Sequence, residues 1–238
     1  MVVGNGMIAQ VFKQYADDDS VIVFASGVSN SKETNEDAFN REIDLLKSTR
    51  RDVCLIYFST CSMYDLSAQN TKYVRHKLVM EGLIKGLFNK SIIFRLPTLV
   101  GNTNNPHTFF NFFKNTINSS LELTIPIGSK RYLIGVEDLK ETLSPMIDKY
   151  KIKKESFNIK INAAFSNDTE VVHIATMMMQ IIGRVSPILF EGSNVCGIDN
   201  DGFTKSYKIN NSDFEKHLKE INYKLPENYT YNLLKKYL

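Results

Sequence analysis

The sequence predicts an α/β fold, in which a doubly wound parallel sheet of reduced strand number precedes a small C-terminal substrate-binding region. Short apolar runs alternate with amphipathic stretches through residues 1–150, and a glycine turn follows the first apolar pair. The runs are rich in β-branched and aromatic residues. Continuous apolar runs between helices are typical of parallel strands that are covered on both faces.

The individual elements follow from the same patterns. The apolar runs predict strands at 2–3, 21–25, 53–58, 91–94 and 156–161. Apolar residues recur at helical spacing at 7–15, 33–48 and 72–88. The segment 109–117 reads as a helix with an aromatic face, 173–182 as an apolar helix, and a further helix begins at 212. The segment 102–106 has three Asn and a Pro, and 191–211 is rich in Gly, Asn, Asp and Ser, which indicates loops.

Composition excludes several classes of protein. The 238 residues carry a net charge of only +3, so a nucleic-acid partner has no support from charge. No apolar run approaches the roughly 18 residues of a membrane span. Cys54, Cys61 and Cys196 form no CxxC pair, and the four histidines form no metal pattern. We therefore expect neither a disulfide framework nor a metal site, and a cytoplasmic location.

The N-terminal turn, Gly4-x-Gly6-x-x-Ala9, lies between a short strand and a helix. The first glycine permits a tight turn, and the second lets the backbone approach a pyrophosphate. The pattern predicts a dinucleotide site formed by Gly4, Asn5, Gly6, Met7 and Ile8. A glycine turn without any ligand explains the pattern about equally well.

Two further segments carry groups that could act on a substrate. Tyr73 and Lys77 are four residues apart in a predicted helix, so they lie on one face. An ammonium beside a phenol lowers its pKa, and such a tyrosine can exchange a proton with a hydroxyl or carbonyl. Thr60 follows the 53–58 strand, where wound sheets bind ligands. The alternatives are an exposed Tyr–Lys pair and a polar loop that caps a helix.

Taken in order, these segments resemble the extended short-chain dehydrogenase/reductases that act on nucleotide sugars, a Rossmann-like family. The similar stretches are Phe58–Asp65, Tyr73–Lys77 with Glu81, Arg95–Gly101, Arg131–Leu139 and Phe157–Ile159. Residues 21–30 resemble the family's fourth strand and the loop after it, which adds Ala25 and Ser26 to the cofactor residues. The resemblance implies residues 1–101 as a dinucleotide-binding core and 102–238 as a substrate-binding region interleaved with the last core strands.

The resemblance also implies roles. Tyr73 would be the general acid/base, Lys77 would lower its pKa and hold the nicotinamide ribose of NAD or NADP, and Thr60 would hydrogen-bond the sugar oxygen. Cys61, Ser62, Thr98 and Arg131 would contact the substrate, with Arg131 on its diphosphate. The implied function is a cytoplasmic 4-keto-sugar reductase of surface polysaccharide synthesis. A nucleotide-sugar epimerase and a non-catalytic relative that binds a nucleotide sugar or a protein remain alternatives.

The sequence departs from the family in three places. Cys61 and Ser62 stand where 4,6-dehydratases have Asp-Glu, so we do not expect dehydration, and the segment is nearer to that of dTDP-4-dehydrorhamnose reductases. Thr98 stands where many members have Asn. Between Ala16 and Ser20, two strands and their helices are missing, and these normally carry the residue that reads the adenosine ribose.

Three expectations concern packing. The family often forms dimers through the Tyr-Lys helix, for which Leu83, Ile84 and Leu87 are candidates, although core burial explains them equally well. We expect His173 to be a packed, hydrogen-bonded residue. Part of the run 177–179, three methionines, should fill the core, with a subunit contact as the second choice.

Overall fold

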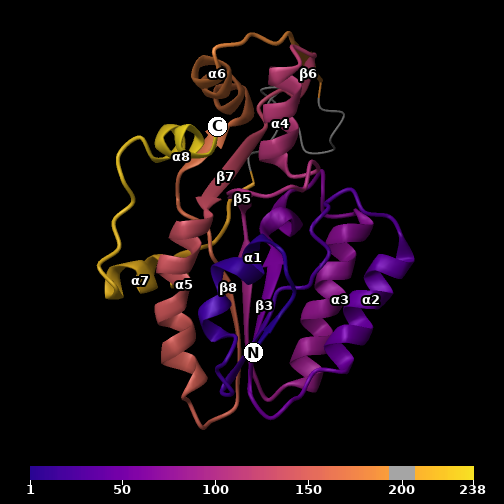
Figure 1. Ribbon diagram of the computed structural model, residues 1–238, viewed down its shortest axis with the longest axis vertical. Coiled ribbons are helices and arrows are strands. Elements are labelled where there is room, and N and C mark those ends of the chain that lie inside the picture. The colour runs from indigo at the N-terminus through magenta and orange to yellow at the C-terminus, as the bar shows by residue number, and fades with distance from the viewer. Residues whose placement is uncertain (193–206) are drawn as a thin grey trace.

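The computed structural model describes residues 1–192 and 207–238 and has an α/β architecture (Figure 1). Five parallel strands form the main sheet in the order β1-β2-β3-β4-β8. These strands are β1 (Val2–Val3), β2 (Val21–Phe24), β3 (Cys54–Thr60), β4 (Lys90–Leu96) and β8 (Phe157–Asn162). Every residue of β2 and β3 is buried, as a strand covered on both faces requires.

Helices cover both faces of this sheet, as predicted. The helices α2 (Glu36–Lys47) and α3 (Lys72–Leu87) lie on one side, and α5 (Val136–Lys151) lies on the other (Figure 1). Alternate residues of β3 divide between two apolar clusters: Leu55 and Tyr57 pack toward α3, and Ile56 and Phe58 belong to the cluster that includes α5. The sheet is therefore the middle layer of the core.

The N-terminal part is shorter than a complete wound sheet. Residues 7–15, predicted as one helix, form the short helix α1 (Met7–Val11) and a 3-10 turn, η1 (Lys13–Tyr15). The chain then enters β2, which pairs with β1 in parallel. Within the described part of the chain, β1 is an edge strand. This agrees with the predicted loss of two strands between Ala16 and Ser20.

The rest of the chain builds a smaller region beyond one end of the main sheet (Figure 1). After β4 it forms a sheet of β5 (Thr98–Val100), β7 (Lys130–Gly135) and β9 (Asp168–Glu170), and a pair of β6 (Leu123–Pro126) and β10 (Ile188–Glu191). The helices here are α4 (Phe109–Asn118), α6 (Val171–Ile182) and α8 (Tyr229–Tyr237). Because β8 returns to the main sheet, this region is interleaved with the core.

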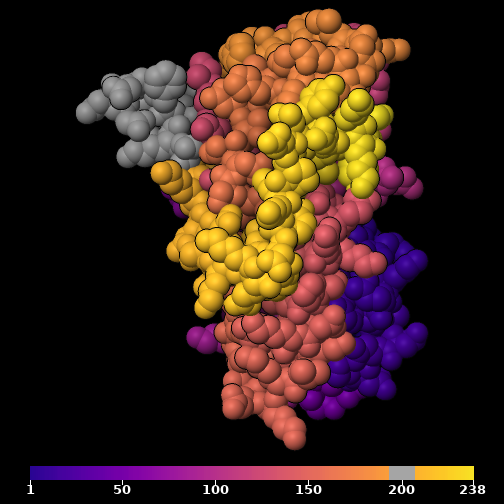
Figure 2. All heavy atoms as spheres, turned by 90° about the vertical axis from the view of Figure 1, so that its left-hand side faces the viewer, coloured from indigo at the N-terminus to yellow at the C-terminus, as the bar shows by residue number. Residues whose placement is uncertain are grey.

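The C-terminal segment spreads along the α5 side of the molecule (Figure 2). The helix α7 (Ser212–Glu220) is held to α5 by His217, whose Nε2 lies 2.8 Å from the Thr142 carbonyl oxygen. Tyr223 and Tyr229 both donate to the Asp138 carboxylate at 2.7 Å. These contacts fix the end of the chain against α5.

Several expectations need correction. The helix α5, the strands β6, β9 and β10, and a separate α8 were not predicted. His173 is exposed on α6 and not packed, because the buried face of that helix is formed by other residues, Met178 among them. Cys196 and most of the predicted 191–211 loop lie outside the described residues. No helix in the described residues is long and apolar enough to span a bilayer.

Candidate active site

The candidate site lies at the carboxyl edge of the main sheet. Because β2, β3 and β4 are parallel and in register, the segments that follow them leave the sheet at the same edge. Thr60 is the last residue of β3 and pairs with Leu96 at the end of β4. This edge is where wound sheets bind ligands.

Thr60 is buried and caps the 3-10 turn η2 (Cys61–Tyr64). Its Oγ1 accepts a hydrogen bond from the Ser62 amide at 3.0 Å and donates to the Ser62 hydroxyl at 2.9 Å. Thr60 therefore has the capping role that was the alternative interpretation of this segment. Thr60 also lies close enough to the Tyr73 hydroxyl to lower the pKa of that phenol, so the two predicted groups are neighbours.

Tyr73 lies in the first turn of α3, which begins after Thr71 caps the amide of Val74. Burial raises the pKa of Tyr73 to about 12; the Thr60 hydroxyl opposes this rise and the negative charge of Glu42 adds to it. That Lys77 lowers this pKa stays a prediction. The Lys77 ammonium lies 5.9 Å from the centre of the Tyr73 ring, and Glu42 neutralises its charge.

Lys77 is 2% exposed and makes its contacts on the side away from solvent. Its Nζ donates to the Tyr57 hydroxyl at 3.0 Å and to Glu42 Oε1 at 3.3 Å. Burial lowers the pKa of Lys77, and the Glu42 charge opposes that shift. Gly27 lies directly above the ammonium, because a Cβ built on it would be 2.6 Å from Nζ.

The glycine turn has the backbone geometry that the pattern predicted. Gly4 has φ +122°, and a Cβ there would lie 2.5 Å from the Ala25 carbonyl oxygen. Only glycine fits this close crossing of the turn and the end of β2. Gly6 is exposed, with no atom within 4 Å of a built Cβ, so its backbone is open to a ligand.

Other predicted cofactor residues surround this turn. Asn5, Gly6 and Met7 line a hollow of about 650 Å³, together with the 102–105 loop and the start of α5. That volume is within the range of small-molecule sites. Ile8 packs against the core, and the Ser26 hydroxyl and carbonyl oxygens accept hydrogen bonds from Arg41 at 3.2 and 3.1 Å.

The predicted substrate residues differ in burial and in their hydrogen bonds. Cys61 is 1% exposed and donates to the Arg95 carbonyl oxygen, and burial raises its pKa to about 12, so its thiol is not offered to a ligand. Its assignment as a substrate contact stays a prediction. Ser62 is half-buried and bound to Thr60, and Thr98 is half-buried at the start of β5.

Arg131 lies on β7, near the turn that follows Thr60. Its Nη1 is 3.7 Å from Asp65 Oδ2 and donates to the Lys130 carbonyl oxygen at 2.8 Å. The guanidinium also faces the ring of Phe109, 6.0 Å from its centre. The Arg131 side chain is 31% exposed, which leaves part of the guanidinium available to an anion.

Sequence reasoning missed three residues of the site: Glu42, Tyr57 and His76. Glu42 is fully buried on α2 and binds both of the others through its carboxylate. One signal could have found it. Glu42 occupies the apolar face of its helix, between Phe39 and Leu46, where a charged residue must have buried partners.

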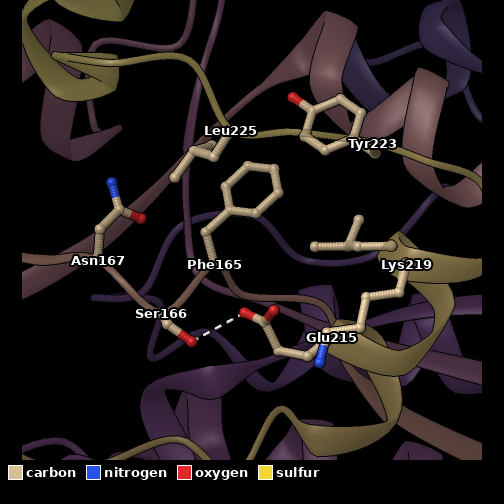
Figure 3. A pocket seen from close by; sticks show the side chains of 8 residues that line it. Phe165, Ser166, Asn167, Glu215, Lys219, Tyr223 and Leu225 are labelled. Carbon is tan, nitrogen blue, oxygen red and sulfur yellow. Dashed lines mark hydrogen bonds between the residues drawn. The ribbon is translucent and has the colours of Figure 1, made fainter.

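A second hollow, of about 460 Å³, lies away from these groups, between the segment after β8 and α7 (Figure 3). Phe165 and Tyr223 form one wall, where their rings stack 5.6 Å apart. On the opposite side, Ser166 donates to Glu215 at 2.8 Å. None of the predicted site residues lines this hollow. Within the described ranges, no group of three or more His, Cys, Asp or Glu side chains is arranged to hold a metal ion.

Comparison with known proteins supports the fold. No protein-family model and no curated protein sequence matches the chain. Among solved structures, the UDP-glucose-4-epimerase of Stenotrophomonas maltophila with bound NAD and formylated UDP-arabinopyranose is 15% identical. The match covers 99% of this chain and 81% of that one, with a TM-score of 0.68.

Two further structures give the same result. The UDP-glucuronic acid 4-epimerase of Bacillus cereus, in complex with UDP-glucuronic acid and NAD, is 18% identical over 95% of this chain and 78% of that chain, with a TM-score of 0.64. RMD from Pseudomonas aeruginosa, complexed with NADPH, is 12% identical over 98% and 84%, with a TM-score of 0.63. The chain therefore has the Rossmann-like α/β fold of nucleotide-sugar epimerases, as its motifs indicated.

Proposed function

We propose that this protein is an NAD(P)-dependent oxidoreductase of a nucleotide-activated sugar, and that its reaction is the reduction of a 4-keto sugar. The observation that carries the proposal is the meeting of Thr60 and Tyr73 at the carboxyl edge of the sheet, with Lys77 behind the tyrosine. The solved neighbours support the ligands, since their crystals hold NAD or NADPH and, in the B. cereus and S. maltophila enzymes, a UDP-sugar.

The glycine turn suits the cofactor better than the adenosine side of the site does. At the glycine turn, the open backbone of Gly6 and the adjoining hollow suit a pyrophosphate. On the adenosine side, β1 is an edge strand within the described residues, so the usual ribose-reading side chain has no counterpart there. The preference between NAD and NADP therefore stays open in this proposal.

The roles of the chain's own residues follow from their positions. When bound, the reduced nicotinamide supplies the hydride. Tyr73 donates its phenolic proton to the carbonyl oxygen of the sugar, and Thr60 hydrogen-bonds the same oxygen. Arg131 binds the diphosphate in competition with Asp65. Lys77 reaches the nicotinamide ribose only if the segment at Gly27 moves aside, because that segment covers the ammonium.

The proposal of reduction rather than epimerisation assigns Tyr73 the role of proton donor. A reductase needs a tyrosine that gives a proton, whereas an epimerase also needs it to accept one from a sugar hydroxyl. Burial holds the pKa of Tyr73 at about 12, which keeps the phenol protonated at neutral pH. Dehydration would need an acid beside Thr60, and Cys61 and Ser62 do not supply one.

A non-catalytic relative that binds a nucleotide sugar is the second candidate. The edge position of β1 favours it, because a dinucleotide normally rests on strands that lie beyond this point. The pairing of Thr60 with Tyr73 favours the enzyme, since a binding protein has no need of that pair.

A homodimer is also proposed, through α3. Of the candidates for this contact, Ile84 is fully buried in the core, and Leu83 and Leu87 pack against it. The exposed apolar residues of the helix are Leu78 and Val79, which are 44% and 51% exposed. A cytoplasmic role in surface polysaccharide synthesis completes the proposal.

The experiment is an assay of NADH and NADPH oxidation with a panel of 4-keto nucleotide sugars. We expect at least one combination of cofactor and sugar nucleotide to support turnover. Arg131→Ala should raise KM for the sugar nucleotide about tenfold, with little change in KM for the cofactor. Lys130→Ala, its neighbour on β7, is the matched control and should change neither constant. Turnover of none of the panel, with tight binding of the sugar nucleotides, would favour the binding protein.

A further inference from the structure

A cluster of buried charges lies behind Tyr73, and its centre is Glu42. The Glu42 side chain is fully buried on α2, yet both of its oxygens are satisfied. Oε2 accepts from the Val28 amide at 2.8 Å and lies 2.9 Å from His76 Nε2. Oε1 accepts from the Tyr57 hydroxyl at 2.7 Å and from Lys77 at 3.3 Å. A carboxylate is buried at this depth only when it is paired and hydrogen-bonded.

The same contacts fix the position of the Lys77 ammonium. Lys77 donates to the Tyr57 hydroxyl, Tyr57 donates to Glu42, and Glu42 accepts from Lys77, so the three groups close a ring. The ammonium lies 5.0 Å from the centre of the Tyr57 ring and 5.9 Å from that of Tyr73. It is therefore held on the Tyr57 side, under Gly27.

We propose that Glu42 is a positioning residue, which holds the Lys77 ammonium against Tyr57 and balances its charge beside Tyr73. The proposal rests on the function assigned above to Tyr73. A balanced ammonium does not draw the proton from a neighbouring phenol, so Tyr73 stays a proton donor. Glu42 thus keeps on Tyr73 the proton that the phenol gives to the carbonyl oxygen of the sugar.

Other groups also face these residues and must be considered. Tyr73 faces Thr60 and Cys61 from the end of β3 and the turn after it, and Glu42 from α2. Lys77 and Tyr57 also face Glu81 on α3. The Glu81 carboxylate is paired with Arg95, which donates to both of its oxygens, at 2.9 and 2.6 Å. Glu42 is the carboxylate that binds the ammonium directly.

The test is an NMR titration of protein labelled with ¹³Cζ-tyrosine, in which the Tyr73 signal is assigned by its loss in Tyr73→Phe. In Glu42→Gln we expect the Tyr73 midpoint to fall by about one pH unit or more. Glu81→Gln is the matched control, a buried glutamate on the helix of Lys77, and should leave the midpoint in place. An unchanged midpoint in Glu42→Gln would overturn the proposal.

A second variant covers the case in which Glu42→Gln does not fold. Tyr57→Phe removes only the hydroxyl that anchors Lys77, and the Tyr73 midpoint should fall in the same direction but less. No movement in Tyr57→Phe would also overturn the proposal. The titration needs no substrate. A shifted midpoint in a protein without turnover would therefore contradict the proposed function and still support the role of Glu42.

Discussion

The glycine turn and the Tyr73 end of the site lie along the same edge of the sheet, but they differ in what holds them. Behind Tyr73, the carboxylate of Glu42 and the ammonium of Lys77 are buried and bound to neighbours from β3, α2 and α3. At the glycine turn, residues 4–6 are exposed and follow a strand of two residues. One end is organised before any ligand arrives, whereas the other offers open backbone that a ligand must cover.

This difference separates two tasks of the proposed enzyme. Proton transfer depends on buried groups whose positions are already fixed, as general acid catalysis requires. Cofactor binding depends on a turn with little structure around it. Changes at the first end should alter rate and stability, and changes at the second should alter cofactor affinity.

The largest effect should come from removing the hydroxyl of Tyr73. Tyr73→Phe should lower kcat by about a hundredfold or more, because general acid catalysis contributes factors of that size. The ring remains, so the thermal unfolding midpoint should hardly move. Turnover measured within a few fold of the wild type would remove Tyr73 as the proton donor.

The next effect concerns stability at the buried end. Glu42→Ala leaves the Lys77 ammonium buried without its partner, and we expect a loss of about 3–5 kcal/mol in the free energy of unfolding. Urea titration measures this loss. Glu36→Ala, on the same helix, removes an exposed ion pair with Lys72 and should cost less than about 1 kcal/mol. Equal losses in both variants would mean that the buried ion pair stabilises the fold no more than an exposed one.

The smallest effects should appear at the glycine turn, where two glycines separate fold from ligand. Gly4→Ala meets the Ala25 carbonyl oxygen and should destabilise the fold by about 1–3 kcal/mol. Gly6→Ala meets no protein atom and should leave stability unchanged, but should weaken dinucleotide binding about tenfold. Cofactor affinity equal to that of the wild type in Gly6→Ala would show that the dinucleotide does not use this turn.

The elements that the sequence predicted well are those whose pattern is local. Helix α3 was predicted to within one residue, because its apolar residues recur at helical spacing and Thr71 caps it. Helix α5 was missed, although Leu139, Leu143 and Ile147 mark its buried face. Pro145 interrupts the pattern and normally ends a helix. The short strands β6, β9 and β10 have too few residues to show a period.

The site was predictable to a similar extent. The spacing of Tyr73 and Lys77 and the position of Thr60 after a strand are local features, and the structure brings the three together. The partner of Lys77 is not local. Glu42 lies 35 residues away on another helix, and only the packing of α2 against α3 brings its carboxylate to the ammonium. Burial of the phenol first, and the negative charge of Glu42 second, raise the pKa of Tyr73 above the value that the Tyr–Lys spacing suggests.

Cofactor binding tests the central claim most directly, because the shortened half of the sheet is the main departure from a complete dinucleotide fold. Calorimetric titration of the protein with NADH and NADPH, separately and at equal concentrations, measures it. We predict binding in the micromolar range for at least one of them. No heat and no thermal stabilisation with either would contradict the proposed oxidoreductase and point to a protein that binds nucleotide sugars without hydride transfer.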